Sequence, residues 1–327
     1  MRETTVPSRE DDLGRELERH RQALTAYFYR MLASPFEAED AVQETFLRAY
    51  RARDSFEGRA AMTTWLHRIA TNVCLDMLRG RKHRVRPMDL GPAREPVESN
   101  LNVPTEITWL EPMPDTLVSP QPDPSDVAAS RESVRLAFVA ALQHLPPRQR
   151  AALILCEVMQ WQAAEVAELL ETTTASINSA LQRARATLKT GAPAATMTTM
   201  DKAQRALLAR YVEAFERYDI SLLTSVIRED ARQSMPPFDL WLQGREDMFR
   251  WWFGPGIGCQ GSRLLPAGTA NGSPAYGQYK PGPVPGRLDP WSLQVIELTP
   301  SGVDEITFFL DTQRLFPLFG LPPHVDA

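Results

Sequence analysis

A proline-rich segment divides this chain into parts that fold separately. Nine prolines fall between Pro87 and Pro124. Each proline removes a backbone hydrogen-bond donor and disfavours helical geometry in the residue before it. The segment is also acidic, because Arg94 is its single basic residue among many carboxylates. We therefore expect an extended acidic linker over residues 87–125, with folded regions on either side.

One island of this linker is too apolar for a passive spacer. The sequence WLEPMPD, residues 109–115, begins with Trp109 and Leu110. Moving large apolar side chains out of water lowers the free energy of the protein. We therefore predict that these two side chains dock on another part of the protein.

The region before the linker, residues 1–86, is predicted to be helical. In LHRIATNVCLDMLRGRKHR, residues 66–84, apolar side chains recur every three or four positions, as in an amphipathic helix packed on other helices. A polar stripe follows the opposite face, and basic side chains end the segment. Such a basic end complements a helix dipole or neutralises phosphates, and this segment alone leaves both interpretations open.

A second helical region is predicted over residues 126–190. Two apolar stripes flank a short polar break, and the second helix begins near Thr174. This pattern is typical of a helix-turn-helix, but an ordinary helical hairpin shares it and the usual turn glycine is absent. Asn, Gln and Arg side chains can read base edges. The outward residues of the second helix are Ser176, Asn178, Ser179, Gln182, Arg183 and Arg185.

The last region, residues 200–327, has a mixed pattern. Helices are predicted around residues 208–215, 221–227 and 245–252. After them, WSLQVIEL alternates, TPSG forms a turn, and VDEITFFL follows as a hairpin partner. We expect an α+β domain of ordinary size.

Composition narrows the class of protein. The net charge of −5 argues against nucleic-acid binding, but the charge is segregated between basic and acidic segments. The three cysteines are far apart and lack metal-ligand spacing. No apolar run is long enough for a membrane span, and the first residues lack a secretory signal. We expect a reduced cytoplasmic protein with no metal, no cofactor and no membrane contact.

Four stretches resemble a known family. They are similar to the extracytoplasmic-function, or group-four, sigma factors of bacterial RNA polymerase, within the sigma-70 family. The stretches are EDAVQETFLRAYRA (39–52), FEGRAAMTTWLHRIATNVCLDMLRGRKHR (56–84), LPPRQRAALIL (145–155) and INSALQRARATL (177–188).

The tail resembles the SnoaL-like domain that is fused to some of these sigma factors, and WLEPMPD resembles a linker motif of that group. The implied fold is multidomain, with two all-α sigma domains followed by an α+β cone. Residues 1–86 would be sigma region 2, residues 126–190 sigma region 4, and residues 200–327 the SnoaL-like domain. The matching tail stretches are SMPPF (234–238), GPGIGCQGSRLLP (254–266), ANGSPA (270–275) and RLFPLFGLPP (314–323).

The resemblance implies a promoter-specificity subunit that has no chemistry of its own. Its partners would be the RNA polymerase core, through the β′ clamp helices and the β flap, and promoter DNA. The clamp contact falls on the polar ridge of the helix over 39–52, formed by Asp40, Gln43 and Glu44.

The resemblance also distributes the DNA contacts. The loop SFEGRAA, residues 55–61 with Phe56, would capture a flipped base of the −10 element, which costs a few kcal/mol and needs a pocket. The helix near Thr174 would read the −35 element, with altered strength because Asn178 and Ala180 stand where relatives often have Lys or Arg. The expected −10 contacts are Asn72, Asp76 and Arg79, and the expected phosphate contacts are Arg81, Lys82 and Arg84.

The role of the tail leaves alternatives open. Trp241, Trp252 and Phe308 are candidates for a ligand pocket, and a hydrophobic core is the competing interpretation. We expect the tail to contact the amino-terminal domain or the linker and to modulate activity, with an unidentified small molecule as a partner. Two other functions compete: a stand-alone helix-turn-helix regulator with a ligand-sensing tail, and a SnoaL-type isomerase or hydrolase with a helical appendage.

Catalysis is not expected. SnoaL-like enzymes use Asp, Tyr, His or Arg in their pocket, and no acid–base pair stands out by spacing in this tail. The candidates would be Tyr211, Asp230, Asp239, Arg245 and Asp311.

Overall fold

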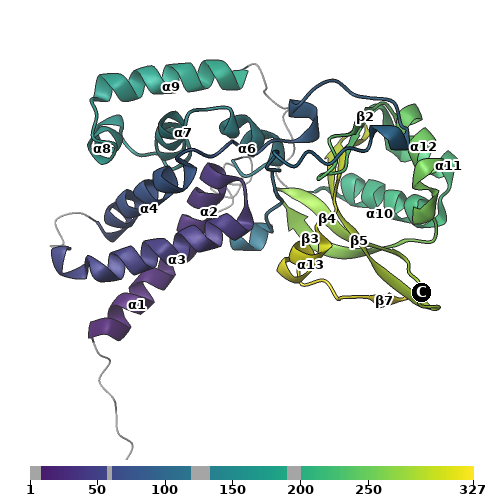
Figure 1. Cartoon of the computed structure of the whole chain (residues 1–327), viewed down its shortest axis with the longest axis horizontal. Helices are drawn as coiled ribbons and strands as arrows, with labels where there is room; N and C mark the ends of the chain where they lie inside the picture. The colour runs from purple at the N-terminus through teal and green to yellow at the C-terminus, as the bar shows by residue number, and fades with distance from the viewer. Residues whose placement is uncertain (1–8, 57–60, 119–132, 190–199) are drawn as a thin grey trace, which may run out of the picture. The chain divides into compact units, whose positions relative to one another are not determined.

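The computed structural model describes residues 9–56, 61–118, 133–189 and 200–327 (Figure 1). The chain forms two compact units that do not follow its order. The helical unit contains residues 1–83 and 116–193, and the tail unit contains residues 84–115 and 194–327. The chain therefore leaves the helical unit, contributes a segment to the tail unit, returns, and then completes the tail unit.

The helical unit consists of short amphipathic helices with recognisable start signals. Ser34 caps α3, because its hydroxyl accepts a hydrogen bond from the Glu37 backbone N–H, and Pro35 occupies the first helical position. The elements are α1 (Arg9–Arg19), α2 (Arg21–Leu32), α3 (Pro35–Arg51), η1 (Arg53–Ser55), α4 (Met62–Leu78), α6 (Leu136–Gln143), α7 (Pro147–Leu153), the π-helical turn η5 (Ile154–Val158), α8 (Ala163–Leu169) and α9 (Thr174–Lys189).

Helix α4 is shorter than predicted. The pattern indicated one helix from residue 66 to residue 84, but α4 ends at Leu78. Gly80 follows with a φ of +75°, the left-handed conformation that commonly ends helices. The basic residues from Arg81 onward therefore lie beyond the helix, and the prediction of a continuous helix through Arg84 is wrong.

The two helical regions share a core around a buried arginine. Helices α6 and α7 pack on α2, and α7 also packs on α4. The Arg150 side chain of α7 is 2% exposed and donates hydrogen bonds to the Met31 carbonyl, to Gln143 Oε1 (2.6 Å) and to the Leu145 carbonyl (3.2 Å). Burial lowers its pKa to about 10. Since Met31 belongs to α2, this arginine holds together two regions that are far apart in sequence.

The tail unit is a mostly antiparallel sheet with helices beside it (Figure 1). The strand order is β2-β1-β6-β5-β4-β3, β7 pairs with β5, and β1 and β6 are parallel. The strands are β1 (Ile227–Ser234), β2 (Trp241–Gln243), β3 (Arg263–Ala270), β4 (Ser273–Pro281), β5 (Arg287–Thr299), β6 (Gly302–Phe309) and β7 (Val325–Asp326), and the helices are α10 (Lys202–Arg217), α11 (Ile220–Val226), α12 (Arg245–Trp252), η6 (Pro255–Cys259) and α13 (Thr312–Leu318).

The predicted hairpin is confirmed. Strands β5 and β6 pair antiparallel, with Thr299 opposite Gly302 at the turn and Leu293 opposite Phe309 at the far end. The three predicted helices correspond to α10, α11 and α12, and the α+β fold class is confirmed. One hydrophobic core joins α10, α11 and α12 to the sheet through Phe215, Trp252 and neighbouring apolar side chains.

The segment from residue 84 to residue 115, here called the strap, is bound to the rest of the tail unit. A bridge between Val85 and Trp109 closes its base. Leu110 is buried, which agrees with the docking predicted for the WLEPMPD island. Instead of a fully extended chain, the strap contains the turns η2 (Pro87–Asp89) and η3 (Glu98–Asn100), with η4 (Asp115–Leu117) at its end.

Hydrogen bonds and ion pairs along the strap attach it to the rest of the tail unit. Asn271 exchanges two hydrogen bonds with Met113, one from the Met113 N–H to Asn271 Oδ1 (2.9 Å) and one from the Asn271 N–H to the Met113 carbonyl (3.1 Å). The Arg314 guanidinium pairs with Glu111 at 2.9 Å. The Trp241 indole N–H donates to the Gly91 carbonyl at 2.9 Å.

Candidate functional sites

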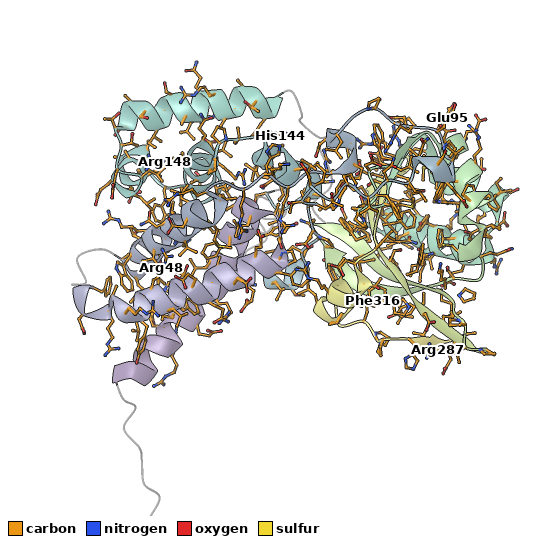
Figure 2. The ribbon with its side chains drawn as sticks, viewed as in Figure 1. Arg48, Glu95, His144, Arg148, Arg287 and Phe316 are labelled. Carbon is orange, nitrogen blue, oxygen red and sulfur yellow. The ribbon has the colours of Figure 1, made fainter. Side chains whose placement is uncertain are left out.

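The predicted polymerase ridge is an exposed edge of α3. Asp40 and Gln43 are exposed, and Glu44 is half-buried and pairs with Arg48 at 2.7 Å. Figure 2 labels Arg48 on α3. Sequence reasoning missed Leu47, which is 53% exposed and lies one helical turn after Gln43. A single exposed apolar side chain is common on protein surfaces, so Leu47 is of interest only because it lies next to the predicted contact residues.

The polar stripe of α4 is partly engaged inside the helical unit. Asn72 is exposed, whereas Asp76 pairs with Arg48 of α3 at 3.1 Å and with Arg79 at 3.2 Å. Arg68, on the same stripe, pairs with Glu168 of α8 at 2.8 Å. The face expected to meet the −10 element therefore carries ion pairs that DNA binding would have to rearrange.

The predicted phosphate contacts separate into two groups. Arg81 and Lys82 are exposed, and Arg81 pairs with Glu37 at 2.9 Å. Arg84 belongs to the strap, where it pairs with Glu111 at 3.3 Å and donates to the Trp109 carbonyl at 2.6 Å. With a side chain only 12% exposed, Arg84 acts in this structure as part of the strap.

The predicted base-capture loop is described only at its edges. Phe56 stacks against Trp65 of α4, with ring centroids 4.9 Å apart and planes tilted by 37°. Residues 57–60 lie outside the described residues. The two rings form an aromatic surface beside the amino-terminal end of α4, on which an unpaired base can stack.

The helix-turn-helix consists of α8 and α9. Glu171 in the turn has a φ of +50°, the left-handed conformation that a glycine would adopt more easily. The Thr172 N–H donates to the Ala167 carbonyl at 2.9 Å, which closes the end of α8. All the predicted −35 residues point outward and are exposed: Ser176, Asn178, Ser179, Gln182 and Arg183.

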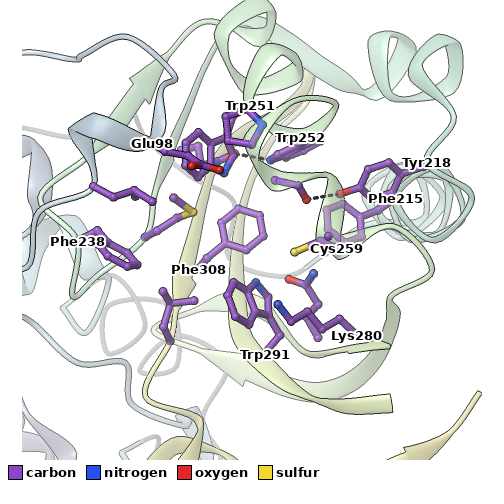
Figure 3. Close-up of a pocket in the computed structure, with 18 residues that line it drawn as sticks. Glu98, Phe215, Tyr218, Phe238, Trp251, Trp252, Cys259, Lys280, Trp291 and Phe308 are labelled. Atoms are coloured by element: carbon purple, nitrogen blue, oxygen red, sulfur yellow. Dashed lines mark hydrogen bonds between the residues drawn. The ribbon is translucent and has the colours of Figure 1, made fainter. Parts of the chain in front are cut away.

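The tail unit contains a cavity of about 440 Å³ (Figure 3). Trp252 and Phe308 line it and also belong to the hydrophobic core, so both interpretations of these residues hold. Trp241 is not among the lining residues, because its indole bonds to Gly91 of the strap at the sheet edge. The lining includes two strap residues, Glu98 and Leu101.

The polar residues considered for catalysis lie outside this lining and have structural partners. Tyr211 is buried and donates to Gln294 Oε1 at 2.8 Å. Asp230 pairs with Arg228, and Asp239 pairs with Arg94 of the strap. The two remaining candidates support the backbone: Arg245 donates to the Thr224 and Ile227 carbonyls, and Asp311 caps α13.

No group of three metal-ligating side chains comes together in the described ranges. Across the same ranges, no helix has the length and hydropathy needed to cross a membrane.

Comparisons with known proteins support the assignment of the helical unit. The family model of Sigma-70 region 2 matches residues 17–84, and that of Sigma-70, region 4 matches residues 135–188. The chain is 45% identical over 321 residues to the ECF RNA polymerase sigma factor SigG of Mycobacterium tuberculosis, covering 96% of this chain and 85% of that protein. It is 30% identical over 215 residues to the ECF RNA polymerase sigma factor SigJ of the same species, covering 66% of this chain and 62% of that protein.

Among solved structures, the fold resembles the crystal structure of the Mycobacterium tuberculosis extracytoplasmic function sigma factor SigJ. The TM-score is 0.62 at 23% identity, and the match covers 95% of this chain and 99% of that chain. The similarity therefore includes the tail as well as the helical regions.

Proposed function

The chain belongs to the extracytoplasmic-function RNA polymerase sigma factors of the sigma-70 family, and on this basis we propose how it binds polymerase, reads a promoter and is controlled by its tail. As a sigma factor, it directs the polymerase core to specific promoters. We infer a cytoplasmic location, because bacterial RNA polymerase works there.

We propose that residues 1–86 bind the polymerase core and the −10 element. The ridge of α3, with Asp40, Gln43, Glu44 and the exposed Leu47, would bind the β′ clamp helices. The stripe of α4 and the adjoining Phe56–Trp65 stack would meet the separated strands of the −10 element, with Arg79, Arg81 and Lys82 near the phosphates.

We propose that residues 126–190 read the −35 element and contact the β flap. The single observation that carries this proposal is the outward polar face of α9, in which every predicted contact residue is exposed. Arg183 and Arg185 are basic residues on this face, and Arg185 pairs with Glu157 in the structure. Arginine is the side chain that most often reads guanine in the major groove, so Arg183 is the proposed base contact.

The tail is proposed to act through the strap. The strap joins the end of the −10 region to the start of the −35 region, yet its hydrogen bonds and ion pairs attach it to the rest of the tail unit. A tail that holds or releases this segment would change how the two DNA-reading regions are connected. Arg84 and Glu111 are the residues through which the end of the −10 region is linked to this control.

Run-off transcription tests the proposal. The full chain is added to purified bacterial core polymerase on genomic templates, and a defined start that depends on the chain is expected. Arg183→Ala should reduce transcription that depends on the −35 element. A chain that yields no defined start, but binds duplex DNA tightly without polymerase, would instead support the stand-alone regulator. Turnover of a substrate by the tail would support the enzyme alternative.

A further inference from the structure

We propose that the tail cavity is a receptor site for a flat apolar molecule with one anionic group, and that its occupant fastens the strap. The binding step stands independently of the proposed function. The effect on transcription deepens that function and depends on it.

The size and the walls of the cavity specify a flat apolar ligand. Its volume of about 440 Å³ lies within the range of small-molecule sites. Trp252 stands edge-on to Phe215, with centroids 5.4 Å apart and planes at 84°, and edge-on to Phe308, at 6.4 Å and 77°. Aromatic walls of this kind favour ring systems, which can stack or pack edge-to-face between them.

The polar groups of the lining define the charge of the ligand. Lys280 is the cationic lining residue and is half-buried, with its Nζ 3.3 Å from the centroid of the Trp291 ring. Glu98 is the anionic lining residue, and it is exposed on the strap. Because an exposed charge is screened by water, the half-buried ammonium has the stronger effect inside the cavity. An anionic group is therefore favoured at Lys280.

The orientation follows from the positions of the two charges. Figure 3 shows Phe308 between Glu98 on one side of the cavity and Lys280 on the other. A molecule with its acidic group at Lys280 would place its apolar end toward Glu98 and the strap. Gln233 is a second donor, because its Oε1 already accepts the Trp252 indole N–H at 2.7 Å and its amide nitrogen remains to donate.

The strap forms part of the cavity wall, so ligand binding and strap docking are coupled. Leu101 follows η3, packs against the hydrophobic core of the tail and lines the cavity. The next strap residue, Asn102, accepts a hydrogen bond from the Asp239 N–H at 3.0 Å. A ligand that touches Leu101 binds the docked strap better than the released strap. It therefore shifts the population toward the docked state, and the shift at a concentration 100 times its Kd is about a hundredfold for a ligand that binds the docked state alone.

The experiment uses the full chain and three probes of one shape: 2-naphthoate, 2-naphthalenemethanol and 2-naphthylmethylammonium. Binding is measured by calorimetry and by quenching of tryptophan fluorescence. We expect 2-naphthoate to bind about tenfold more tightly than the alcohol, as one charge-assisted hydrogen bond would provide. Lys280→Met should remove that preference while keeping the cover over Trp291.

A cavity-filling variant tests the location. Gly258 lines the cavity, and a Cβ built on it meets no atom within 4 Å. Gly258→Leu should weaken 2-naphthoate binding at least about tenfold. Gly14→Leu is the matched control, because Gly14 also has open space and lies in α1. Absence of saturable binding, or equal binding by the Gly258→Leu variant, would overturn the receptor site. If 2-naphthylmethylammonium bound most tightly of the three probes, the proposal that the ligand is anionic would be overturned.

Hydrogen exchange tests the strap. Saturating 2-naphthoate should slow exchange of the Arg94 and Asp239 amides about tenfold or more, because both hydrogen bonds cross between the strap and the rest of the tail unit: Arg94 donates to the Trp241 carbonyl and Asp239 to the Asn102 carbonyl. The Gly258→Leu variant should show no slowing. If 2-naphthoate fills the cavity and these amides exchange at the same rate, the coupling is overturned while the receptor site stands. If the chain failed to direct run-off transcription, the ligand-binding and hydrogen-exchange results would be unaffected. Failure of the proposed function can therefore be told apart from failure of the receptor site.

Discussion

Glu297 and Glu305 lie directly opposite each other on β5 and β6, inside the tail unit. Glu305 is buried and pairs with Arg232 at 2.9 Å. The Arg86 guanidinium of the strap favours the charged form of Glu305, and the Asp304 carboxylate opposes it. Burial, assisted by the Glu297 carboxylate, raises the pKa of Glu305 to about 7. The folded tail therefore holds this proton more tightly than the unfolded chain does.

The first prediction concerns pH. Between about pH 4.5 and about pH 7 the unfolded chain has already released the proton that the folded chain keeps, so this carboxyl makes stability fall as pH rises. The full effect is at most roughly 3 kcal/mol and is constant above about pH 7. Urea unfolding of the full chain and of Glu305→Gln at about pH 5 and about pH 8 measures it. The Gln variant should gain stability relative to wild type only at the higher pH, and an equal difference at both would contradict the assignment.

The second prediction concerns the buried arginine of the helical unit. Arg150→Ala leaves the Met31, Gln143 and Leu145 acceptors without their donor, so it should destabilise the helical unit by about 3 kcal/mol. Arg148→Ala, two residues earlier and exposed, removes one longer hydrogen bond to the Leu170 carbonyl (3.3 Å) and should change stability by less than about 1 kcal/mol. Urea unfolding followed by circular dichroism compares the two, and similar losses would mean that Arg150 does not hold the unit together.

A third test separates strap attachment from backbone strain. Asn271 has a φ of +55°, which glycine and aspartate tolerate. Asn271→Gly removes the acceptor for the Met113 N–H, whereas Asn271→Asp retains an oxygen there. The Gly variant should expose the strap to limited proteolysis several-fold faster and change run-off transcription, whereas the Asp variant, which keeps the acceptor but buries a carboxylate, should be cleaved more slowly than the Gly variant. Equal cleavage of all three would show that this contact does not hold the strap.

The turn of the helix-turn-helix offers a stabilising change. Glu171 pays a conformational cost in the left-handed region, so Glu171→Gly should stabilise the helical unit by about 0.5–1 kcal/mol. Glu171→Ala keeps a side chain in the same conformation and should give no such gain. Thermal unfolding distinguishes them, and a less stable glycine variant would mean that strain at this turn is negligible.

The fifth prediction assigns roles to two surfaces. Arg183→Ala should weaken use of the −35 element and leave polymerase binding intact. Asp40→Ala combined with Gln43→Ala should weaken binding to core polymerase by about tenfold. Fluorescence anisotropy with labelled chain measures core binding, and run-off transcription measures promoter use. Exchanged phenotypes would refute the proposed roles of α3 and α9.

The elements most visible in the sequence were those with strong local signals. The β5–β6 hairpin and helix α12 follow from alternation, a turn and helical spacing. Strands β3 and β4 were not predicted, because Pro266, Gly268 and Gly277 interrupt them. Gly277 is explained only by the fold, since a Cβ there would lie 2.6 Å from Leu321.

The site residues also divide into those with a local sequence signal and those whose place depends on distant parts of the chain. The outward face of α9 follows from periodicity, whereas nothing local distinguishes Trp241 from Trp252. Trp252 lies on the buried face of α12, and Trp241 lies on a three-residue strand where the strap provides its hydrogen bond. The placement of Arg84 in the strap depends on Glu111, a partner 27 positions later in the sequence.

The bridge between Val85 and Trp109 makes the strap a loop that is closed at its base. Residues 86–108 are thereby removed from the path that connects the −10 region to the −35 region. If the base opened, these residues would add up to about 75 Å of extended chain. The local concentration of one DNA-reading region around the other falls steeply as such a tether lengthens. On the proposed roles of these regions, we expect the state of the strap to limit which spacings between two promoter elements the protein can bridge.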